Sequence, residues 1–411
     1  MPAGPIVVRK YGGSSLADIA RLRAVARDLR AARDAGQRLV VVVSAMGDTT
    51  DRLSAQAHEA NPEPPRRELD MLLTVGERIS MSLLCMALAA EGVPATSLTG
   101  SQAGIITDAS HTDARILAVR PIRIPEALAS GKVVVVAGFQ GVCGETKEIT
   151  TLGRGGSDTT AVALAHALGA ERCEILKDVP GVMTADPKLV PTARRIERLD
   201  AAAMQRLADA GCGVVHGKAV EYARQHGVPL FVGSSFEPGP GTVVDPPAAP
   251  AVEATPDRFE PLAVTIGRGQ ARLEIVARGP AAATQAAALA ADATRAGPLT
   301  AQWMSTGARW HWEAWGPQAH LDPVAAAARA AQAATAGTLE IDWTPGQAVI
   351  TVVGRRPENW AAGLRALAAT FLAADLGEAP VRSDGDALRI LVPDARAAAA
   401  ATTLHDRLLG S

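Results

Sequence analysis

Short apolar runs alternate with longer amphipathic segments along the first 244 residues of the chain. The runs are rich in Val and Ile, which indicates strands that are buried on both faces. Between them, apolar residues recur at helical spacing, as in Leu22, Val25, Ala26 and Leu29. This alternation predicts an α/β domain with a mostly parallel sheet and helices on both faces. The predicted strands are Ile6–Val8, Leu39–Val43, Val133–Val136, Glu174–Leu176 and Pro229–Val232.

The pattern changes after Val244. Residues 245–260 are rich in proline and predict a linker. Beyond it, alanine-rich helical segments separate strand-like stretches, and all six tryptophans of the chain lie there. We therefore expect two ferredoxin-like α+β units in residues 261–411, after a domain of residues 1–244. The strand-like stretches are Leu262–Ile266, Arg272–Val276, Gln347–Val353 and Ala387–Val392.

Aromatic residues alternate in one of these stretches. Trp310 and Trp312, and less regularly Trp315, predict a strand with one aromatic face. Such a face packs in a core or at a dimer interface in most proteins, and a ligand pocket is the alternative.

Composition narrows the class of protein. A chain of 411 residues is too long for one core, so two or three domains are expected. The formal net charge of −2 argues against a nucleic-acid partner or a polybasic membrane patch. The apolar runs are shorter than the roughly 20 residues that span a bilayer, and the N-terminus does not resemble a signal peptide. The scattered cysteines fit reduced thiols in a cytoplasmic protein.

A glycine-rich run, Thr150–Asp158, comes directly before a helical pattern. Glycine lets the backbone approach a ligand closely and adopt positive φ. Arg154 offers a planar fork for a carboxylate or a phosphate. We expect Ser157 or Asp158 to cap the helix and to leave its N-terminal amides facing an anion.

A second glycine turn, Arg9–Ser15, follows the first predicted strand, and a helical pattern begins near Asp18. Strand, turn and helix in this order place backbone amides around phosphate oxygens, and Lys10 adds a mobile positive charge. The spacing of a Walker loop is absent. Two such loops predict an enzyme that handles phosphate.

Seven motifs of the chain resemble those of the aspartokinases and occur in that family's order. They are Lys10–Ser15, Ser44–Thr50, Leu73–Ser80, Thr99–Gly104, Gly138–Gly141, Thr151–Asp158 and Asp178–Pro187. The resemblance implies the amino acid kinase fold, an α/β/α sandwich with a mostly parallel sheet, followed by two ferredoxin-like ACT-type domains. It also implies transfer of the ATP γ-phosphoryl group to the side-chain carboxylate of L-aspartate, giving 4-phospho-L-aspartate. Mg²⁺ would be carried by ATP, without a direct protein ligand.

The same resemblance assigns roles to individual residues. Lys10 would stabilise the transferring phosphate, and Arg154 would clamp the α-carboxylate of aspartate. Glu77 and Asp158 would hold its α-amino group. Ser44 and Thr50 would also contact the amino acid. Lys10, Arg154 and Asp158 are thus the expected catalytic residues. The expected nucleotide-binding residues are Lys10, Gly12, Gly13, Ser14, Lys177, Asp178, Met183 and Lys188.

The nucleotide segment departs from the family pattern. Lys177 stands where a Ser or Thr is usual, Met183 replaces a Tyr, and Lys188 replaces an Arg. Gly213 stands where aspartokinases carry a lysine, so one cation is lost. Lys177 or the nearby Lys218 could restore this charge from another direction. Either the protein is a working kinase with altered nucleotide affinity, or its activity is marginal.

Three functions stay open at this stage. The first is an aspartate kinase that forms a homodimer or a higher oligomer through its ACT-like domains. The second is a related kinase that acts on another acidic amino acid. The third is a non-catalytic partner that binds an amino acid or a kinase subunit.

Overall fold

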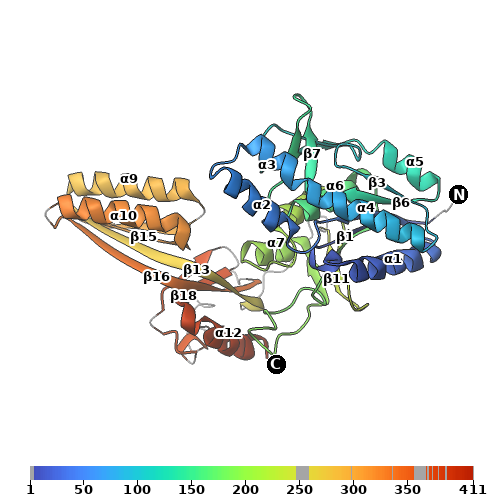
Figure 1. The fold of residues 1–411 in the computed structure, drawn as a ribbon. Helices are drawn as coiled ribbons and strands as arrows, with labels where there is room; N and C mark the ends of the chain where they lie inside the picture. The colour runs from blue at the N-terminus through green and yellow to red at the C-terminus, as the bar shows by residue number, and fades with distance from the viewer. Residues whose placement is uncertain are drawn as a thin grey trace. The chain divides into compact units, whose positions relative to one another are not determined.

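The computed structural model describes residues 4–246, 259–297, 299–335, 337–355, 367, 370–372, 374–377, 379–384 and 387–410. The chain forms two compact units (Figure 1). The first comprises residues 1–183 and 195–253, and the second comprises residues 184–194 and 254–411. Residues 184–194 thus belong to the second unit, although they precede the predicted linker. Most of that linker, 245–260, lies outside the described residues.

An eight-stranded sheet forms the centre of the first unit, in the order β10-β12-β11-β9-β1-β2-β6-β3. All neighbouring strands are parallel except β11 and β12. The predicted strands are confirmed with small shifts at their ends. The strands of the sheet are β1 (Ile6–Tyr11), β2 (Arg38–Val43), β3 (Ala95–Leu98), β6 (Val133–Ala137), β9 (Arg172–Lys177), β10 (Arg198–Asp200), β11 (Leu230–Ser234) and β12 (Thr242–Asp245).

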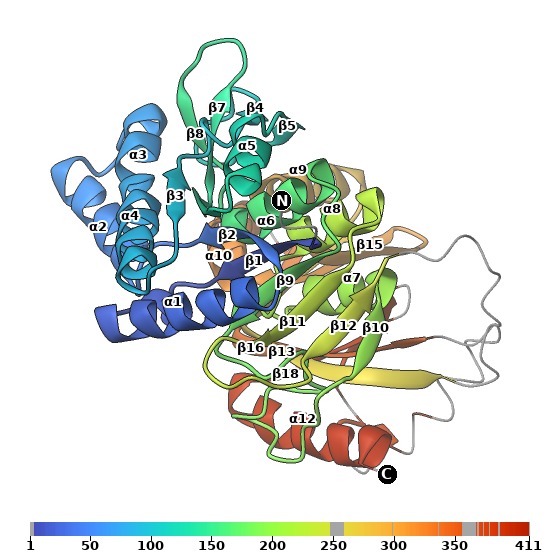
Figure 2. The ribbon, with the colours of Figure 1, turned by 90° about the vertical axis from the view of Figure 1, so that its right-hand side faces the viewer.

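Helices cover both faces of this sheet (Figure 2). Helices α1 and α4 pack on one face, and α6 packs on the other with α8 beside it. The runs of Val are apolar throughout because successive side chains of a strand point to opposite faces, and both faces are buried here. The helices are α1 (Ile19–Asp34), α2 (Thr49–Ala60), α3 (Arg66–Leu73), α4 (Val75–Ala90), α5 (Arg123–Ala129), α6 (Gly156–Ala167), α7 (Ala201–Asp209) and α8 (Gly217–His226), with a 3₁₀ turn, η1, at Ser14–Leu16.

A smaller four-stranded sheet, in the order β5-β4-β7-β8, lies in the same unit. Its strands are β4 (Ile105–Thr107), β5 (Ile116–Val119), β7 (Gln140–Cys143) and β8 (Ile149–Thr151). Strand β8 leads through Gly153 and Gly155 into α6, so this sheet positions one wall of the cleft described below.

One segment of the first unit is longer and more apolar than the sequence pattern indicated. Residues Arg66–Ala90, which contain α3 and α4, are long and apolar enough to cross a membrane by length and composition. Met81, Leu84 and Leu88 of this segment are buried in the core beneath α1. The apolar character therefore has a structural cause inside the unit.

The second unit contains one six-stranded sheet, in the order β14-β15-β13-β16-β18-β17. All its neighbouring strands are antiparallel. Its elements are β13 (Glu260–Arg278), α9 (Pro280–Ala296), β14 (Thr300–Thr306), β15 (Arg309–Pro317), α10 (Gln318–Ala334), β16 (Leu339–Arg355), β17 (Val381–Asp384), β18 (Ala387–Pro393) and α12 (Asp394–Leu409).

Two long strands, β13 and β16, join two ferredoxin-like halves of this sheet. The predicted strands at 262–266 and 272–276 are in fact one strand, β13, with register shifts between Gly267 and Arg272. The part of β13 after these shifts pairs with β15, while the earlier part pairs with the end of β16, which pairs with β18. One half is therefore inserted into the other. With this qualification, the predicted fold class is confirmed for both parts of the chain.

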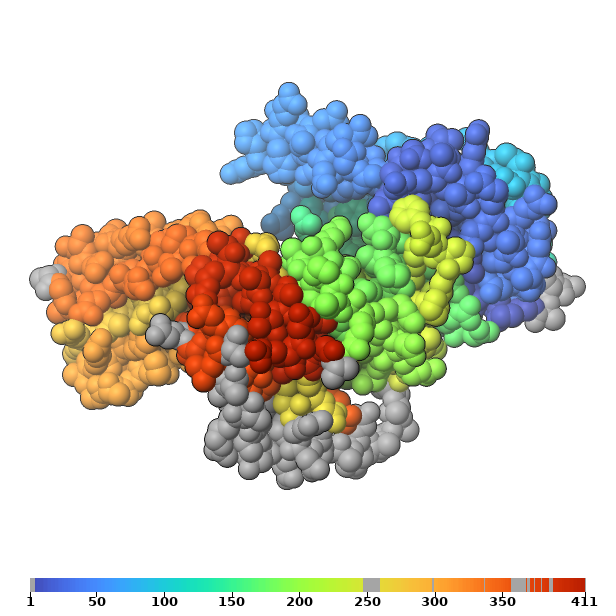
Figure 3. Space-filling view, turned by 90° about the horizontal axis from the view of Figure 1, so that it is seen from below, coloured from blue at the N-terminus to red at the C-terminus, as the bar shows by residue number. Residues whose placement is uncertain are grey.

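Each half has its own core. Helices α9 and α10 pack on one half around Leu273, Ile275 and Trp312. Helix α12 packs on the other half around Ile350 and Leu404. Figure 3 shows the outer side of α12 in dark red.

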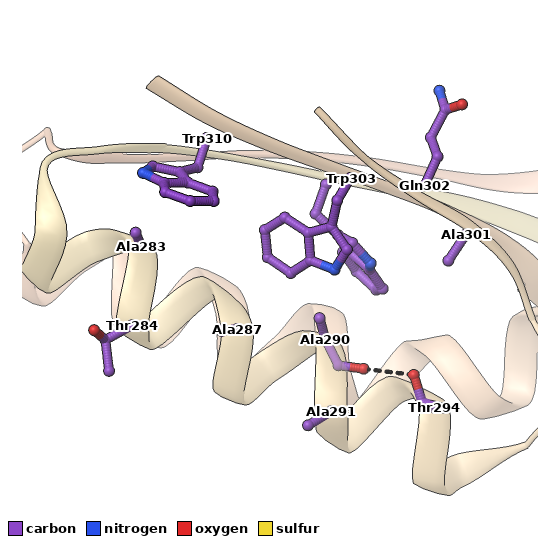
Figure 4. A pocket seen from close by; sticks show the side chains of 11 residues that line it. Ala283, Thr284, Ala287, Ala290, Ala291, Thr294, Ala301, Gln302, Trp303 and Trp310 are labelled. Carbon is purple, nitrogen blue, oxygen red and sulfur yellow. Dashed lines mark hydrogen bonds between the residues drawn. The ribbon is translucent and has the colours of Figure 1, made fainter. Parts of the chain in front are cut away.

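The predicted aromatic face is correct for two tryptophans and wrong for the third. Trp310 and Trp312 face α9 together with Trp303 of β14, which lies opposite Trp312 with ring centroids 6.2 Å apart (Figure 4). These rings and the alanines of α9 line a cleft of about 720 Å³. Trp315 lies three residues after Trp312 and so points to the opposite face.

The opposite face carries a buried charge cluster around Glu313. Its carboxylate lies 2.6 Å from Arg272 and 2.7 Å from Arg382, and it accepts a hydrogen bond of 3.0 Å from the indole of Trp315. Arg382 also lies over the Trp315 ring, 4.2 Å from its centroid. Burial would raise the pKa of Glu313, but these donors lower it to about 2. The cluster joins β15 and β13 to β17, and thus one half of the sheet to the other.

Candidate active site

A cleft of about 720 Å³ opens at the carboxyl ends of β1, β2 and β9 in the first unit. Ligands of open α/β sheets bind at this edge. Lys10 comes from β1, Ser44 and Ala45 follow β2, and Lys177 ends β9. The glycine run before α6 closes the cleft on another side. Both glycine loops that the sequence singled out therefore meet at one place.

Asp158 holds two ammonium groups in this cleft. Its Oδ1 lies 2.7 Å from Nζ of Lys10, and its Oδ2 lies 3.4 Å from Nζ of Lys177. The Asp158 and Lys10 side chains are almost completely buried. Burial alone would raise the pKa of Asp158, but Lys10 and Lys177 lower it to about 2. The carboxylate is thus ionised and fixes two positive charges at the base of the cleft.

Lys177 reaches the position at which the chain has lost a cation. Its Nζ lies 3.5 Å from the carbonyl oxygen of Gly213, and Gly213 also lines the cleft. Burial lowers the pKa of Lys177, and the nearby charge of Asp158 raises it again. Lys218, the other candidate, instead pairs with Asp113 at 2.5 Å and does not line the cleft.

Gly155 allows a close approach at the edge of the cleft. A Cβ on Gly12, by contrast, would lie 3.7 Å from Nζ of Lys10, which is an ordinary contact distance. Gly155 has φ of 73°, and a Cβ there would lie 2.0 Å from Cγ of His216. Any larger residue at position 155 would displace the His216 ring.

Helix α6 begins differently from the prediction. Its N-cap is Gly155 in the left-handed region, with no side-chain cap, and Ser157 and Asp158 lie in the first turn. Asp158 cannot serve as a cap because its carboxylate is turned toward Lys10. Gly155, Gly156 and Ser157 all line the cleft, so the N-terminal end of α6 faces it as expected.

Glu77 supplies a second buried carboxylate. It lies on α4 with only 3 % of its surface exposed, and its Oε1 accepts a hydrogen bond of 3.0 Å from the backbone N–H of Ala45. Its Oε2 is buried without a hydrogen-bond partner among the described residues. Burial raises the pKa of Glu77 to about 7, against the lowering effect of backbone N–H groups and of Lys10. Such an oxygen is suited to a cationic ligand group.

Arg154 lies at the exposed rim of the same cleft. No carboxylate of the described part of the chain forms an ion pair with it, so its guanidinium is available to a ligand. Ser44 and Thr50 also line the cleft, and Thr50 lies in the first turn of α2. The cleft therefore combines a fixed cation pair, a partly unpaired carboxylate and an available arginine.

Several predicted nucleotide-binding residues lie outside the lining of the cleft. Gly12 and Ser14 belong to the turn beneath it, and Asp178 is exposed just after β9. Met183 forms an isolated bridge with Arg195. Lys188 lies in the second unit. The roles predicted for these five residues stay predictions.

The cleft also contains residues that the sequence analysis missed. Asp51 and Ser54 follow Thr50 on α2, and Cys212 and His216 flank Gly213. The backbone N–H of His216 donates to Asp158 at 3.3 Å. Spacing gave no signal for Thr112 or Thr151, which line the opposite wall. Ser54 lies four residues after Thr50 on α2, so helical spacing could have indicated Ser54.

The described residues contain no group of three or more His, Cys, Asp or Glu side chains that could hold a metal ion. Asp158 is engaged by both lysines, and Glu77 has one oxygen on a backbone amide.

An α/β/α sandwich whose carboxyl edge carries two glycine loops and a lysine pair has the architecture of a small-molecule kinase. The model of the Amino acid kinase family matches residues 5–234, more than half of the chain. The chain belongs to this family.

Curated relatives narrow the comparison for the first unit. The chain is 56 % identical over 239 residues to the aspartokinase of Corynebacterium efficiens. The matched region covers 58 % of this chain and 57 % of that relative. Over 239 residues it is also 54 % identical to the aspartokinase of Thermus thermophilus, which covers 58 % of this chain and 59 % of that protein. The matched region thus spans less than two thirds of these relatives.

Solved structures match nearly the whole chain. Escherichia coli aspartokinase III, in complex with aspartate and ADP, superposes with a TM-score of 0.73 at 22 % identity, covering 99 % of this chain and 100 % of that one. This likeness shows the fold. The aspartate kinase of Synechocystis matches with a TM-score of 0.55 at 36 % identity, covering 98 % of this chain and 69 % of that chain.

Proposed function

We propose that the first unit transfers the γ-phosphoryl group of ATP to the side-chain carboxylate of L-aspartate and forms 4-phospho-L-aspartate. The observation that carries this proposal is the joint presence, in one cleft, of the Lys10–Asp158–Lys177 cluster and the unpaired oxygen of Glu77. The first feature suits phosphate, and the second suits the ammonium group of an amino acid. The aspartokinase relatives of this region support the same assignment.

Phosphoryl transfer to a carboxylate requires charge compensation and alignment more than a strong base, because the nucleophile is ionised at neutral pH. Lys10 and Lys177 would contact the phosphate oxygens and stabilise the charge that develops on them. Gly13 and Ser14 would add donors from the turn after β1, whereas the N–H of Gly12 donates to the carbonyl of Leu176 at 3.3 Å. Asp158 would hold both lysines in place, and we assign it this role instead of the predicted contact with the amino group.

The amino acid would bind at the other end of the cleft. Arg154 would hold its α-carboxylate in two parallel hydrogen bonds. The Oε2 of Glu77 would accept a hydrogen bond from its α-ammonium group, which would complete the hydrogen bonding of this carboxylate. Ser44 and Thr50 would contact the substrate between these two groups.

ATP would bring Mg²⁺ with its phosphates, as in other phosphoryl-transfer enzymes. The metal would neutralise charge on the phosphates. Asp178 and Met183 are the proposed rim for the rest of the nucleotide, while the role predicted for Lys188, which belongs to the second unit, stays a prediction. Met183 suits the face of a purine because its thioether is polarizable.

We also propose that the protein is cytoplasmic and forms a homodimer or a higher oligomer through its second unit. The edge strand β14 supports an interface, since Trp303 and Met304 on it, and Trp310 on β15, are 45 %, 47 % and 41 % exposed. Sedimentation velocity of the full chain, beside Met304→Glu, tests this. A monomer at all concentrations would contradict it.

The test of the reaction is ADP release in a coupled assay with ATP, Mg²⁺ and a panel of acceptors. Aspartate should support turnover. Succinate, which lacks the ammonium group, should support little, and glutamate tests the length of the acceptor. Arg154→Ala should raise the KM for aspartate at least tenfold, since a charge-assisted hydrogen bond contributes roughly 1.5–3 kcal/mol. Turnover with glutamate alone would favour a different acidic substrate, and no turnover with folded protein would favour a non-catalytic partner.

A further inference from the structure

A third buried carboxylate lies behind the wall of the cleft. Asp70 on α3 has no exposed surface, and it lies outside the lining of the cleft. Its Oδ1 accepts a hydrogen bond of 2.6 Å from the hydroxyl of Thr151, and its Oδ2 lies 2.6 Å from Nδ1 of His111. The backbone N–H of Thr112 donates to both oxygens, at 3.1 and 3.2 Å. A buried aspartate thus binds two segments that are far from it in the sequence.

Both of these segments form the wall that presents Arg154. Thr112 and Thr151 line the cleft, and Thr151 ends β8, three residues before Arg154. The two segments are also joined directly, since the N–H of Ala114 donates to the carbonyl of Thr151 at 2.8 Å. Asp70 therefore fixes the strand from which the arginine loop departs.

The loop around Thr112 is packed closely against the glycine run that precedes α6. Gly153 has φ of 72°, and a Cβ there would lie 2.5 Å from Oδ1 of Asp113. The same Asp113 oxygen pairs with Lys218 on α8 at 2.5 Å. A movement of the loop around residue 112 would therefore be transmitted to Gly153, which is adjacent to Arg154.

Thr112 has a conformation that needs support. Its φ is 70°, which is rare for a β-branched residue and costs about 1–3 kcal/mol. The bonds from its N–H to Asp70, and from its hydroxyl to the carbonyl of His111 at 2.6 Å, stabilise this conformation. Without the carboxylate of Asp70, this strained conformation would lose the charged acceptor of the Thr112 N–H.

We propose that Asp70 is a positioning residue for the amino-acid end of the cleft. Through Thr112 and Thr151 it holds the Gly153–Arg154 segment in the orientation that binds the α-carboxylate. This inference rests on the proposed function. It predicts an effect on the amino acid, because the lysine cluster at the phosphate end has no contact with Asp70 in the described structure.

The test compares steady-state constants of the full chain and Asp70→Asn, which keeps the size of the side chain and removes its charge. The KM for aspartate should rise roughly tenfold, because small displacements of a positioning group cost up to about 10²-fold. The KM for ATP should stay within about twofold. Thr151→Val, which removes one of the hydrogen bonds, should shift the aspartate KM in the same direction by less.

A rescue variant separates positioning from general destabilisation. Gly at position 112 adopts positive φ without strain, so Thr112→Gly added to Asp70→Asn should lower the aspartate KM again. Thr242→Val is the control, since it breaks buried hydrogen bonds on β12 of the larger sheet, to the carbonyl of Ile196 at 2.6 Å and from the N–H of Val182 at 2.9 Å, and none of them involves Asp70. It should leave the aspartate KM unchanged.

Equal increases in both KM values in Asp70→Asn, or a fall in melting temperature with an unchanged aspartate KM, would overturn the inference. If Asp70→Asn fails to fold, an unchanged aspartate KM in Thr151→Val would overturn it as well. A wild-type protein that shows no turnover with aspartate would instead overturn the proposed function, and this inference with it.

Discussion

The ammonium of Lys177 lies 3.5 Å from the carbonyl oxygen of Gly213. Aspartokinases carry a lysine at the position of Gly213, and the resemblance alone left open whether another residue replaces that charge. Lys177 ends β9, shares Asp158 with Lys10 and lines the same cleft as Gly213. Among the described residues, apart from its two chain neighbours, none lies within 4 Å of a Cβ added to Gly213. We therefore propose that Lys177, at the end of β9, replaces the lost cation.

We predict that Lys177→Ala lowers kcat by about 10²–10³-fold, the usual effect of removing one donor that stabilises transition-state charge. Adding Gly213→Lys to this variant should recover part of the activity, because the space at position 213 is open. Single-turnover kinetics with saturating ATP measure the effect. Lys132→Ala is the control, because Lys132 directly precedes β6 and so lies at the amino end of this strand, away from the cleft. Unchanged kcat in Lys177→Ala would assign the phosphate charge to Lys10 alone.

The raised pKa of Glu77 predicts a pH dependence. An ammonium ligand needs the ionised carboxylate, and the pKa of Glu77 is about 7 in the free protein. The kcat/KM for aspartate should therefore rise between pH 6 and pH 8, and Glu77→Gln should be weaker and flat over this range. A profile that keeps the same rise in Glu77→Gln would assign it to another group.

The same pKa shift affects stability in the direction opposite to that of most carboxylates. Between its ordinary pKa of 4.5 and about 7, Glu77 binds more protons in the folded protein than in the unfolded one. The stabilisation that protonated Glu77 gives to the folded protein is therefore present below pH 4.5 and is lost as the pH rises through 7. Urea unfolding of wild type and Glu77→Gln at pH 5 and pH 8 should show a smaller decrease for the variant. An equal decrease in both proteins would exclude Glu77 as the cause.

Asp158→Asn should destabilise the first unit by about 3–5 kcal/mol, because it leaves two lysine charges near each other without their buried partner. Because the pKa of Asp158 is lowered in the folded protein, its ionised form stabilises the fold. This stabilisation is present above the ordinary pKa of 3.8 and is lost as the pH falls through about 2. Urea unfolding at pH 7 measures the change. Asp34→Asn is a suitable control, because that side chain is 57 % exposed in its ion pair with Arg30. Similar stability of the two variants would contradict the assignment.

Glu313→Leu should destabilise the second unit by about 3–5 kcal/mol, because the buried guanidinium of Arg382 would lose its carboxylate, while Arg272 would keep only Glu274 and Asp342. Calorimetry of the full chain should show a lower transition temperature for this unit. Glu340→Gln removes an exposed pair with Arg278 and should have little effect. An unchanged transition in Glu313→Leu would mean that solvent reaches the arginines.

The fold of the first unit was predictable because its strands and helices are local patterns. The apolar runs from Ile6 to Val232 became strands, and Asp18 became the N-cap of α1, where it accepts a hydrogen bond of 2.8 Å from the N–H of Arg21. In the second unit the prediction divided β13 at Gly267, since a glycine between apolar stretches is typical of a turn. Pairing with β16 on both sides of the register shift keeps the strand continuous.

The sequence predicted part of the lining of the cleft and few of its contacts. Lys10, Glu77, Arg154 and Asp158 line one cleft, as the resemblance implied. The sharing of Asp158 by Lys10 and Lys177 depends on the packing of α6 against the sheet, which no local pattern encodes. The contacts of Asp70 with His111 and Thr151 also depend on packing, because these residues lie 41 and 81 positions further along the chain.

The most direct test of the proposed function traps its product. Purified protein with ATP, Mg²⁺, aspartate and hydroxylamine should form a hydroxamate, because hydroxylamine attacks an acyl phosphate. Arg154→Ala at the same aspartate concentration should form much less. The hydroxamate signal of the wild-type protein should depend on both ATP and aspartate. ADP release from folded wild-type protein without any hydroxamate, or no reaction at all, would contradict it.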